Sequence, residues 1–172
     1  EAVKMLGDAV AIAPEAAEAR NYYGVALKSI GKLEEGKEQI LKAIDINVNN
    51  FGAYANLNDL VDYKEEPRLV ENMRKIFDDA PDQDDPRLMP LHFGYAKALD
   101  DIGEHPKALE HYIIGARQKR ATLSYDEKDT SKFFGDIKAA FPAEMFKNRP
   151  FQGLPNDQMI FIVGMPRSGS TL

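Results

Sequence analysis

The sequence predicts an all-α array of paired helices, followed by the first strand and loop of an α/β domain that is truncated at the chain end. Small and apolar residues recur with a period of thirty-four residues over the first two-thirds of the chain. The last twelve residues pass from an apolar run into a loop rich in glycine and serine. A length of 172 residues suits about one domain, or one domain and a piece of another.

Helices are expected at 1–13, 17–30, 33–47, 51–63, 67–79, 89–102 and 106–121. The repeat is clearest where a set of four positions in the first helix recurs thirty-four residues later, from Ala2, Leu6, Ala9 and Pro14 to Gly36, Ile40, Ala43 and Val48. The third copy is degraded, and the fourth, which begins at Ala108, is displaced by four residues inserted between Asp78 and Pro90. Gly31 and Gly103 lie in the turns that join the two helices of a repeat.

Small residues at the repeated positions let adjacent helices approach closely, so that stability comes from stacking of neighbouring pairs. These small residues are Gly24, Ala43, Ala96, Ala108 and Gly115. A period of thirty-four residues in helix–turn–helix units resembles the tetratricopeptide repeat, which implies an α-α superhelix. A helical hairpin array of another repeat family is the alternative, because two of the four copies fit the spacing poorly.

An anion-binding loop is predicted at the end of the chain. The apolar run Met159–Val163 suits a strand buried on both faces of a parallel sheet, and Gly164 then begins a sharp turn. Backbone N–H groups at the start of a following helix attract phosphate-like charge, and Arg167 adds a fixed positive charge. A simple tight turn is the alternative for this run.

Substitutions in the loop distinguish it from a nucleotide-hydrolysing P-loop. Gly164 and Gly169 have the Walker A spacing, but Ser170 occupies the position of the lysine that reaches the terminal phosphates. The run Pro166–Thr171 resembles instead the 5′-phosphosulfate-binding loop of sulfotransferases, in the form found in the tyrosylprotein sulfotransferases and their bacterial relatives. Many of those relatives carry N-terminal tetratricopeptide repeats.

The resemblance implies an enzyme that transfers a sulfuryl group from 3′-phosphoadenosine 5′-phosphosulfate to an acceptor hydroxyl or amine, without a metal. It implies a catalytic role for Arg167 and a nucleotide-binding role for Arg167, Ser168, Gly169, Ser170 and Thr171. We expect this chain alone to be inactive and to bind the nucleotide weakly, because one loop supplies one end of the site. The general base and the 3′-phosphate site are expected beyond Leu172.

The alternative function is a peptide-binding scaffold in which the terminal loop is incidental. Its groove would be lined by residues of the first helix of each repeat, namely Asn21, Val25, Lys28, Phe93 and Lys97. This set contains no clear carboxylate clamp, so a peptide or protein ligand remains unspecified. A further Arg/Ser pair downstream would favour the sulfotransferase, and a Walker B aspartate would favour an NTPase.

Composition favours an ordinary soluble protein. A net charge of −6 and a pI near 5.1 argue against a nucleic-acid-binding surface. No apolar stretch approaches the roughly eighteen residues of a membrane span, so no membrane partner is expected. The chain has no cysteine, which is compatible with a reducing, cytoplasmic location, although the true N-terminus is expected to be missing.

Several other features favour structural roles over binding. Asp45, Asn47 and Asn49 resemble the opening of a calcium loop, but the required glycine and closing glutamate are absent. The acidic run from Asp78 to Asp85 is expected to be a solvated connector. The spacing of the three histidines along the chain does not match that of metal ligands, so surface or packing positions are expected for His92, His105 and His111. Basic residues at the end of the last repeat helix complement its dipole, namely Arg117, Lys119 and Arg120.

Residues 123–158 are predicted to connect the repeats, at 1–122, to the sulfotransferase segment at 159–172. Ser131 or Thr130 would cap a helix, and Pro142 would end it or begin a second short one. The helix carries an apolar, aromatic-rich face of Phe133, Phe134, Ile137, Ala140 and Phe141. This composition favours a fixed interface with the next domain over a flexible tether.

Overall fold

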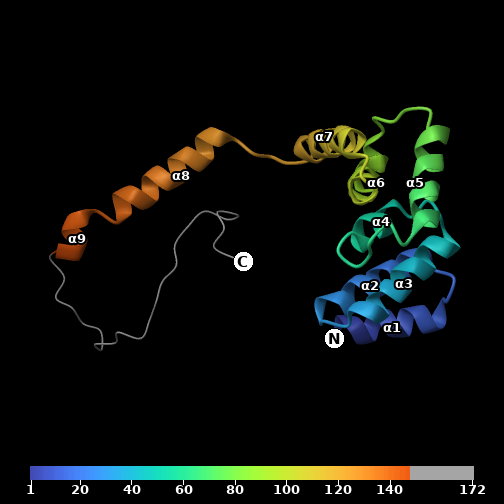
Figure 1. Cartoon of the computed structure of the whole chain (residues 1–172). Helices are drawn as coiled ribbons and strands as arrows, with labels where there is room; N and C mark the ends of the chain where they lie inside the picture. Colours follow the sequence, from blue (N-terminus) through green and yellow to red (C-terminus); the bar gives the residue numbers. More distant parts are fainter. Residues whose placement is uncertain (148–172) are drawn as a thin grey trace. The chain divides into compact units, whose positions relative to one another are not determined.

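The computed structural model describes residues 1–147, which form a series of α-helices joined by turns and loops (Figure 1). The described residues contain no strand, so the all-α prediction for this part is confirmed. The chain divides into two units, Glu1–Ser124 and Tyr125–Leu172. The first unit contains α1 (Ala2–Ile12), α2 (Ala17–Ser29), α3 (Leu33–Ile46), α4 (Phe51–Leu57), α5 (Pro67–Asp79), the short 3₁₀ helix η1 (Pro86–Leu88), α6 (Met89–Asp101) and α7 (His105–Ala121).

Two helix pairs in the first unit, α2–α3 and α6–α7, share one turn geometry. Gly31 and Gly103 have φ angles of 83° and 87°, in the left-handed region that favours glycine. In the first turn the N–H of Lys32 donates to the Leu27 carbonyl at 3.0 Å, and in the second the N–H of Glu104 donates to the Leu99 carbonyl at 2.8 Å. Both helices therefore end in the same glycine-dependent hydrogen-bonded turn, as the sequence predicts.

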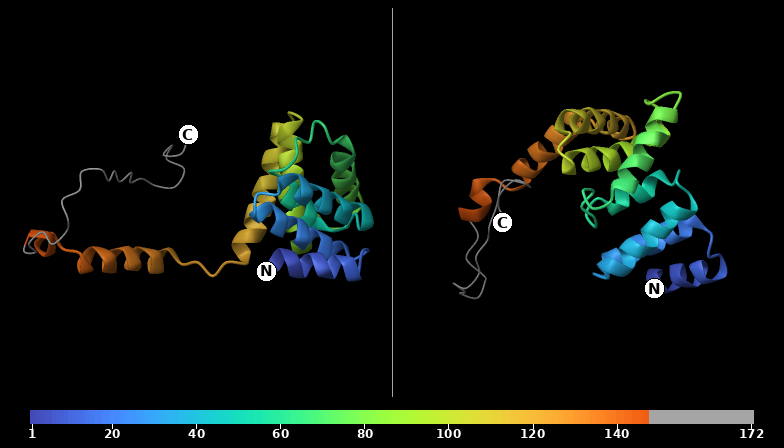
Figure 2. Two further views of the ribbon diagram at one scale, coloured as in Figure 1. Left: turned by 90° about the horizontal axis from the view of Figure 1, so that it is seen from below. Right: turned by 45° about the vertical axis from the view of Figure 1, so that its right-hand side comes forward.

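Close backbone contact explains why small residues recur in the helices. A Cβ atom at Gly24 would lie 2.7 Å from the Gly36 carbonyl oxygen, and a Cβ at Gly36 would lie 2.8 Å from the Gly24 oxygen. Glycine at both positions lets α2 and α3 pack backbone to backbone. A similar contact joins α6 to α4, where a Cβ at Gly94 would lie 3.0 Å from the Tyr54 Cβ. The two views in Figure 2 show α2 and α3 lying side by side.

The core of the first unit runs through α3, α4, α5, α6 and α7. Its fully buried side chains come from every one of the helices α3 to α6 and include Ile40, Tyr54, Leu57, Leu69, Met73 and Leu91. Tyr63 follows α4 and is also fully buried, and its hydroxyl donates to the Tyr54 carbonyl at 3.1 Å. Burial of these apolar groups is the main favourable term that holds the helices together.

The predicted helix at 51–63 is wrong in its second half, because α4 ends at Leu57. The Asn58 side chain donates to the Phe93 carbonyl at 3.2 Å and contacts the Tyr63 hydroxyl at 3.2 Å. Asp62 accepts a hydrogen bond from the Lys64 N–H at 2.9 Å and so forms a local turn. Asp62 thereby pairs a backbone N–H that a continuing helix would have bonded, while Asn58 ties the end of α4 to α6. The other predicted helix ends in the first unit agree with the structure to within one residue.

The second unit begins with α8 (Glu127–Ala140) and α9 (Ala143–Lys147). The predicted cap at Ser131 or Thr130 is wrong, because Asp126 caps α8 by accepting from the Lys128 N–H at 2.8 Å. Aspartate is among the strongest N-cap residues, and it starts the helix one turn earlier. The predicted break at Pro142 is confirmed. Within residues 1–147, no helix combines the length and apolarity that a membrane crossing needs.

Candidate functional site

The residues of the predicted anion loop, Arg167, Ser168, Gly169, Ser170 and Thr171, lie outside the described residues. The predicted strand at 159–163 lies outside them too. The roles of the loop residues stay predictions. The fixed interface expected between residues 123–158 and a following domain also stays a prediction. The described chain offers three other candidates: the face formed by α2, α4 and α6, a buried histidine pair, and a pocket beside α5.

The first candidate is the predicted groove, on the first helix of each repeat. Asn21 is buried and its side-chain oxygen accepts from the Asn56 amide at 3.0 Å. The Lys28 ammonium donates to the Asp59 carboxylate at 2.7 Å and to the Asn56 carbonyl at 3.2 Å. The hydrogen bond from Lys28 lowers the pKa of Asp59. Both polar residues therefore link α2 to α4 and its following turn.

The far end of this face, on α6, is similarly paired. The Lys97 ammonium hydrogen-bonds to the Asp101 carboxylate at 2.5 Å and lies 5.8 Å from the centre of the Tyr63 ring. Burial opposes ionisation of Asp101, but hydrogen bonds from Lys97 and the Tyr63 N–H lower its pKa overall. Val25 and Phe93 are partly buried, and the Phe93 ring packs beside Gly115 of α7, where an added Cβ would lie 3.3 Å from it. The polar residues of this face, Asn21, Lys28 and Lys97, already have partners.

The second candidate is a contact between His92 and His111 that the sequence spacing does not indicate. Their Nδ1 atoms lie 2.9 Å apart, and His92 Nε2 lies 2.9 Å from the Gln83 carbonyl oxygen. A carbonyl can only accept, so His92 carries its proton on Nε2 and its Nδ1 accepts from His111. The two rings pack against Phe77 and Tyr95.

Burial keeps both imidazoles neutral near pH 7. Burial lowers the pKa of His92, and burial together with the neighbouring His92 lowers the pKa of His111 to about 4. The packing role expected for His92 is confirmed, since its side chain is fully buried. Among the described residues, no group of three or more His, Cys, Asp or Glu side chains is placed to hold a metal ion.

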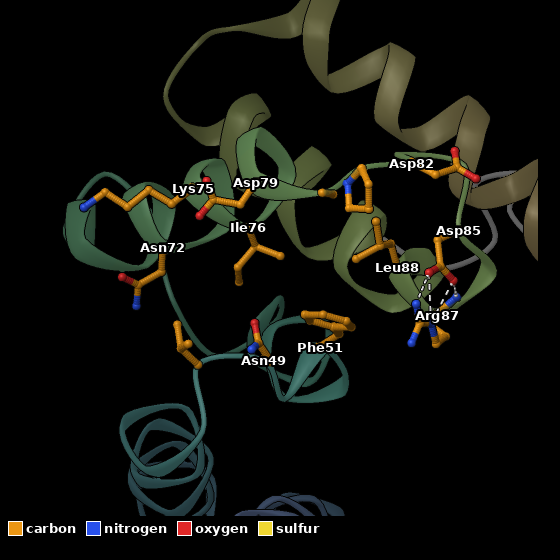
Figure 3. Close-up of a pocket in the computed structure, with 13 residues that line it drawn as sticks. Asn49, Phe51, Asn72, Lys75, Ile76, Asp79, Asp82, Asp85, Arg87 and Leu88 are labelled. Carbon is orange, nitrogen blue, oxygen red and sulfur yellow. Dashed lines mark hydrogen bonds and ion pairs between the residues drawn. The ribbon is translucent and has the colours of Figure 1, made fainter.

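The third candidate is a pocket of about 720 Å³ beside α5 (Figure 3). Its walls come from the turn between α3 and α4, from one side of α5, and from the segment that leads through η1. Its apolar lining consists of Val48, Phe51, Ile76, Ala80, Pro81 and Leu88. Its polar lining consists of Asn49, Asn72, Lys75, Asp79, Asp82, Asp85 and Arg87. None of the predicted groove residues lines it.

The acidic connector that borders this pocket is exposed, as predicted, but it is held by specific bonds. Asp84 forms an ion pair with Arg117 on α7, and its carbonyl accepts from the Gln118 amide at 2.9 Å. The Gln83 amide donates back to the Phe77 carbonyl of α5 at 3.3 Å. Arg117 and Gln118 lie more than thirty residues from Asp84 along the chain, so no local pattern predicts their contacts with it. The connector is therefore an ordered wall of the pocket.

No protein-family model matches this chain. The chain is similar to an "Uncharacterized protein" of Aquifex aeolicus (strain VF5), with 27% identity over 146 residues. The match covers 85% of this chain and 19% of the relative, so the chain spans about a fifth of the relative's length.

Proposed function

We propose that this chain is the N-terminal segment of a sulfotransferase that uses 3′-phosphoadenosine 5′-phosphosulfate. The observation that carries the proposal is the terminal run Gly164–Thr171, which follows five apolar or sulfur-containing residues. It combines the glycine spacing of a phosphate loop with hydroxyl residues and an upstream arginine in place of the Walker lysine. This combination suits an anion that is bound and released as a leaving group.

The reaction is an in-line transfer. The acceptor oxygen or nitrogen forms a bond to sulfur while the bond from sulfur to the bridging phosphate oxygen breaks, and the acceptor proton passes to a base outside this chain. Negative charge grows on the departing phosphate. Arg167 stabilises that charge, while the backbone N–H groups and hydroxyls of 168–171 fix the phosphate position.

The helical array serves as an accessory domain, which we assign to the tetratricopeptide type. The shared turns at Gly31 and Gly103 and the contact between Gly24 and Gly36 support a repeated helix-pair architecture. Such arrays position partner proteins beside an enzyme. We place the enzyme in the cytoplasm, since a chain without cysteine suits a reducing compartment.

Replacement of Arg167 in the full-length protein tests the enzymatic proposal. Arg167→Ala is expected to cost about 2.7–4 kcal/mol of transition-state stabilisation, which is the effect of removing one such donor. The readout is turnover with the sulfate-donor nucleotide, and Arg74→Ala, at an exposed position of α5, is a control with the same change in charge. An unchanged turnover in Arg167→Ala would remove this residue from the mechanism.

The second candidate function is a peptide-binding scaffold without an enzymatic role. It is favoured by two partly exposed apolar residues on the first helices of two repeats, Val25 on α2 and Phe93 on α6. If binding through this face is the function, Val25→Asp would abolish it and Arg167→Ala would leave it intact. The sulfotransferase proposal predicts the opposite sensitivity for sulfuryl transfer to a small acceptor.

A further inference from the structure

The pocket beside α5 has an apolar floor and is large enough to hold a large side chain. Phe51, Ile76 and Leu88 point into the space between the α3–α4 turn and α5 (Figure 3). The volume of about 720 Å³ falls within the range of ligand-binding pockets. Val48 adds to the floor and keeps 42% of its surface exposed. Partly exposed apolar residues at the base of a hollow favour burial by a ligand.

The rim of the pocket carries unpaired negative charge. Arg87 is neutralised by Asp85, with Nε 2.9 Å from Oδ2, and Lys75 lies 3.4 Å from the Glu71 carboxylate on α5. Asp79 and Asp82, by contrast, have no cation within ion-pair distance among residues 1–147. The rim is therefore complementary to a ligand with positive charges.

Hydrogen bonds hold both walls in place without a ligand. On one side the Tyr54 hydroxyl donates to the Val48 carbonyl at 3.1 Å, and the Asn49 N–H donates to the Asn47 side chain at 3.0 Å. On the other side His92 Nε2 donates to the Gln83 carbonyl, next to Asp82 in the chain. Preformed walls reduce the conformational entropy that the protein loses when a ligand binds.

We propose that this pocket binds a peptide segment that presents a large apolar side chain flanked by lysine or arginine. The apolar side chain would occupy the floor, and the flanking cations would pair with Asp79 and Asp82. The exposed Asn49 amide offers a donor and an acceptor that match a peptide backbone. This site is separate from the face of α2, α4 and α6, and it does not depend on sulfuryl transfer.

The direct test is titration of the chain with a fluorescein-labelled Gly-Lys-Phe-Lys-Gly peptide, followed by fluorescence anisotropy. Two further peptides serve as comparisons: Gly-Glu-Phe-Glu-Gly reverses the charges, and Gly-Lys-Ser-Lys-Gly removes the apolar side chain. We expect the first peptide to bind more tightly than both others. Equal affinity for the three, or no binding at millimolar peptide, would overturn the proposal.

Variants locate the bound peptide. The double variant Asp79→Asn with Asp82→Asn should weaken binding about five-fold, the effect of losing two exposed ion pairs. The variant with Asp8→Asn and Glu34→Gln, at exposed positions on α1 and α3, makes the same change in net charge and should bind as the wild type does. Amide chemical shifts should move at Ile76 and Leu88. Shifts confined to Val25 and Phe93, or equal weakening in both double variants, would refute the site.

Discussion

Acidification should destabilise the helical array through the pair of His92 and His111, in a pH range where few other groups titrate. An imidazole in the unfolded chain has a pKa of about 6.5, while burial and the neighbouring His92 hold the pKa of folded His111 at about 4. Between these values the unfolded state binds more protons, so stability is full above pH 6.5 and is lost as pH falls toward 4.

The magnitude follows from the two pKa values of His111. From about pH 7.5 to about pH 5.5, uptake of one proton by the unfolded chain lowers the free energy of unfolding by about 1.3 kcal/mol. Protonation of His92, whose pKa is also lowered by burial, acts in the same direction. The carboxylates of Asp59 and Asp85 have pKa values held below 3.8 by hydrogen bonds from Lys28 and Arg87, so they titrate below this range.

Urea unfolding at both pH values, followed by circular dichroism, measures this effect in the wild type and in His111→Asn. The asparagine amide can replace the Nδ1–H donor to His92 but cannot ionise. The fall in the free energy of unfolding between the two pH values should therefore be about 1.3 kcal/mol smaller in His111→Asn than in the wild type. His105→Asn is the matched control, because that ring is 70% exposed and bonds to Asp100. Parallel pH dependence of the wild type and His111→Asn would refute the inferred role of this buried imidazole.

Four further substitutions test the packing by urea unfolding. Gly24→Ala should lower the free energy of unfolding by about 1–3 kcal/mol, because its Cβ would lie 2.7 Å from the Gly36 carbonyl oxygen and push α2 away from α3. Gly135→Ala, with no atom within 4 Å of the added Cβ, should leave α8 unchanged or raise its helicity. Gly31→Ala should cost about 1 kcal/mol through its φ of 83°. Tyr63→Phe should cost about 1–3 kcal/mol by leaving a buried carbonyl unpaired. A neutral Gly24→Ala or Tyr63→Phe would contradict these contacts.

Local signals in the sequence were sufficient for most helices of the first unit. Pro67 opens α5 at the position where a missing N–H costs nothing, and Gly31 and Gly103 end α2 and α6 with positive φ angles. Gly24 and Gly36 carried a packing signal, because small residues at repeated positions indicate close helices. These features depend on residues close together in the chain.

The features that sequence reasoning missed depend on distant partners. Where α4 ends early, the Asn58 side chain bonds to the carbonyl of Phe93, thirty-five residues away along the chain. His92 on α6 contacts His111 on α7, nineteen residues later, and this spacing matches no local sequence pattern that would indicate a contact. The pocket beside α5 is assembled from three separate segments, so no single stretch of sequence indicates it.

The sulfotransferase proposal is tested most directly by titration calorimetry of the full-length protein with 3′-phosphoadenosine 5′-phosphate, and separately with ATP and Mg²⁺. We expect the first nucleotide to bind without metal, to bind more tightly than ATP, and to be weakened by Arg167→Ala but not by Arg74→Ala. The chain of residues 1–172 alone should bind it weakly or not at all, and micromolar binding by that chain would show that the loop is preorganised without its sheet. Preference of the full-length protein for ATP with Mg²⁺, unaffected by Arg167→Ala, would contradict the proposed function.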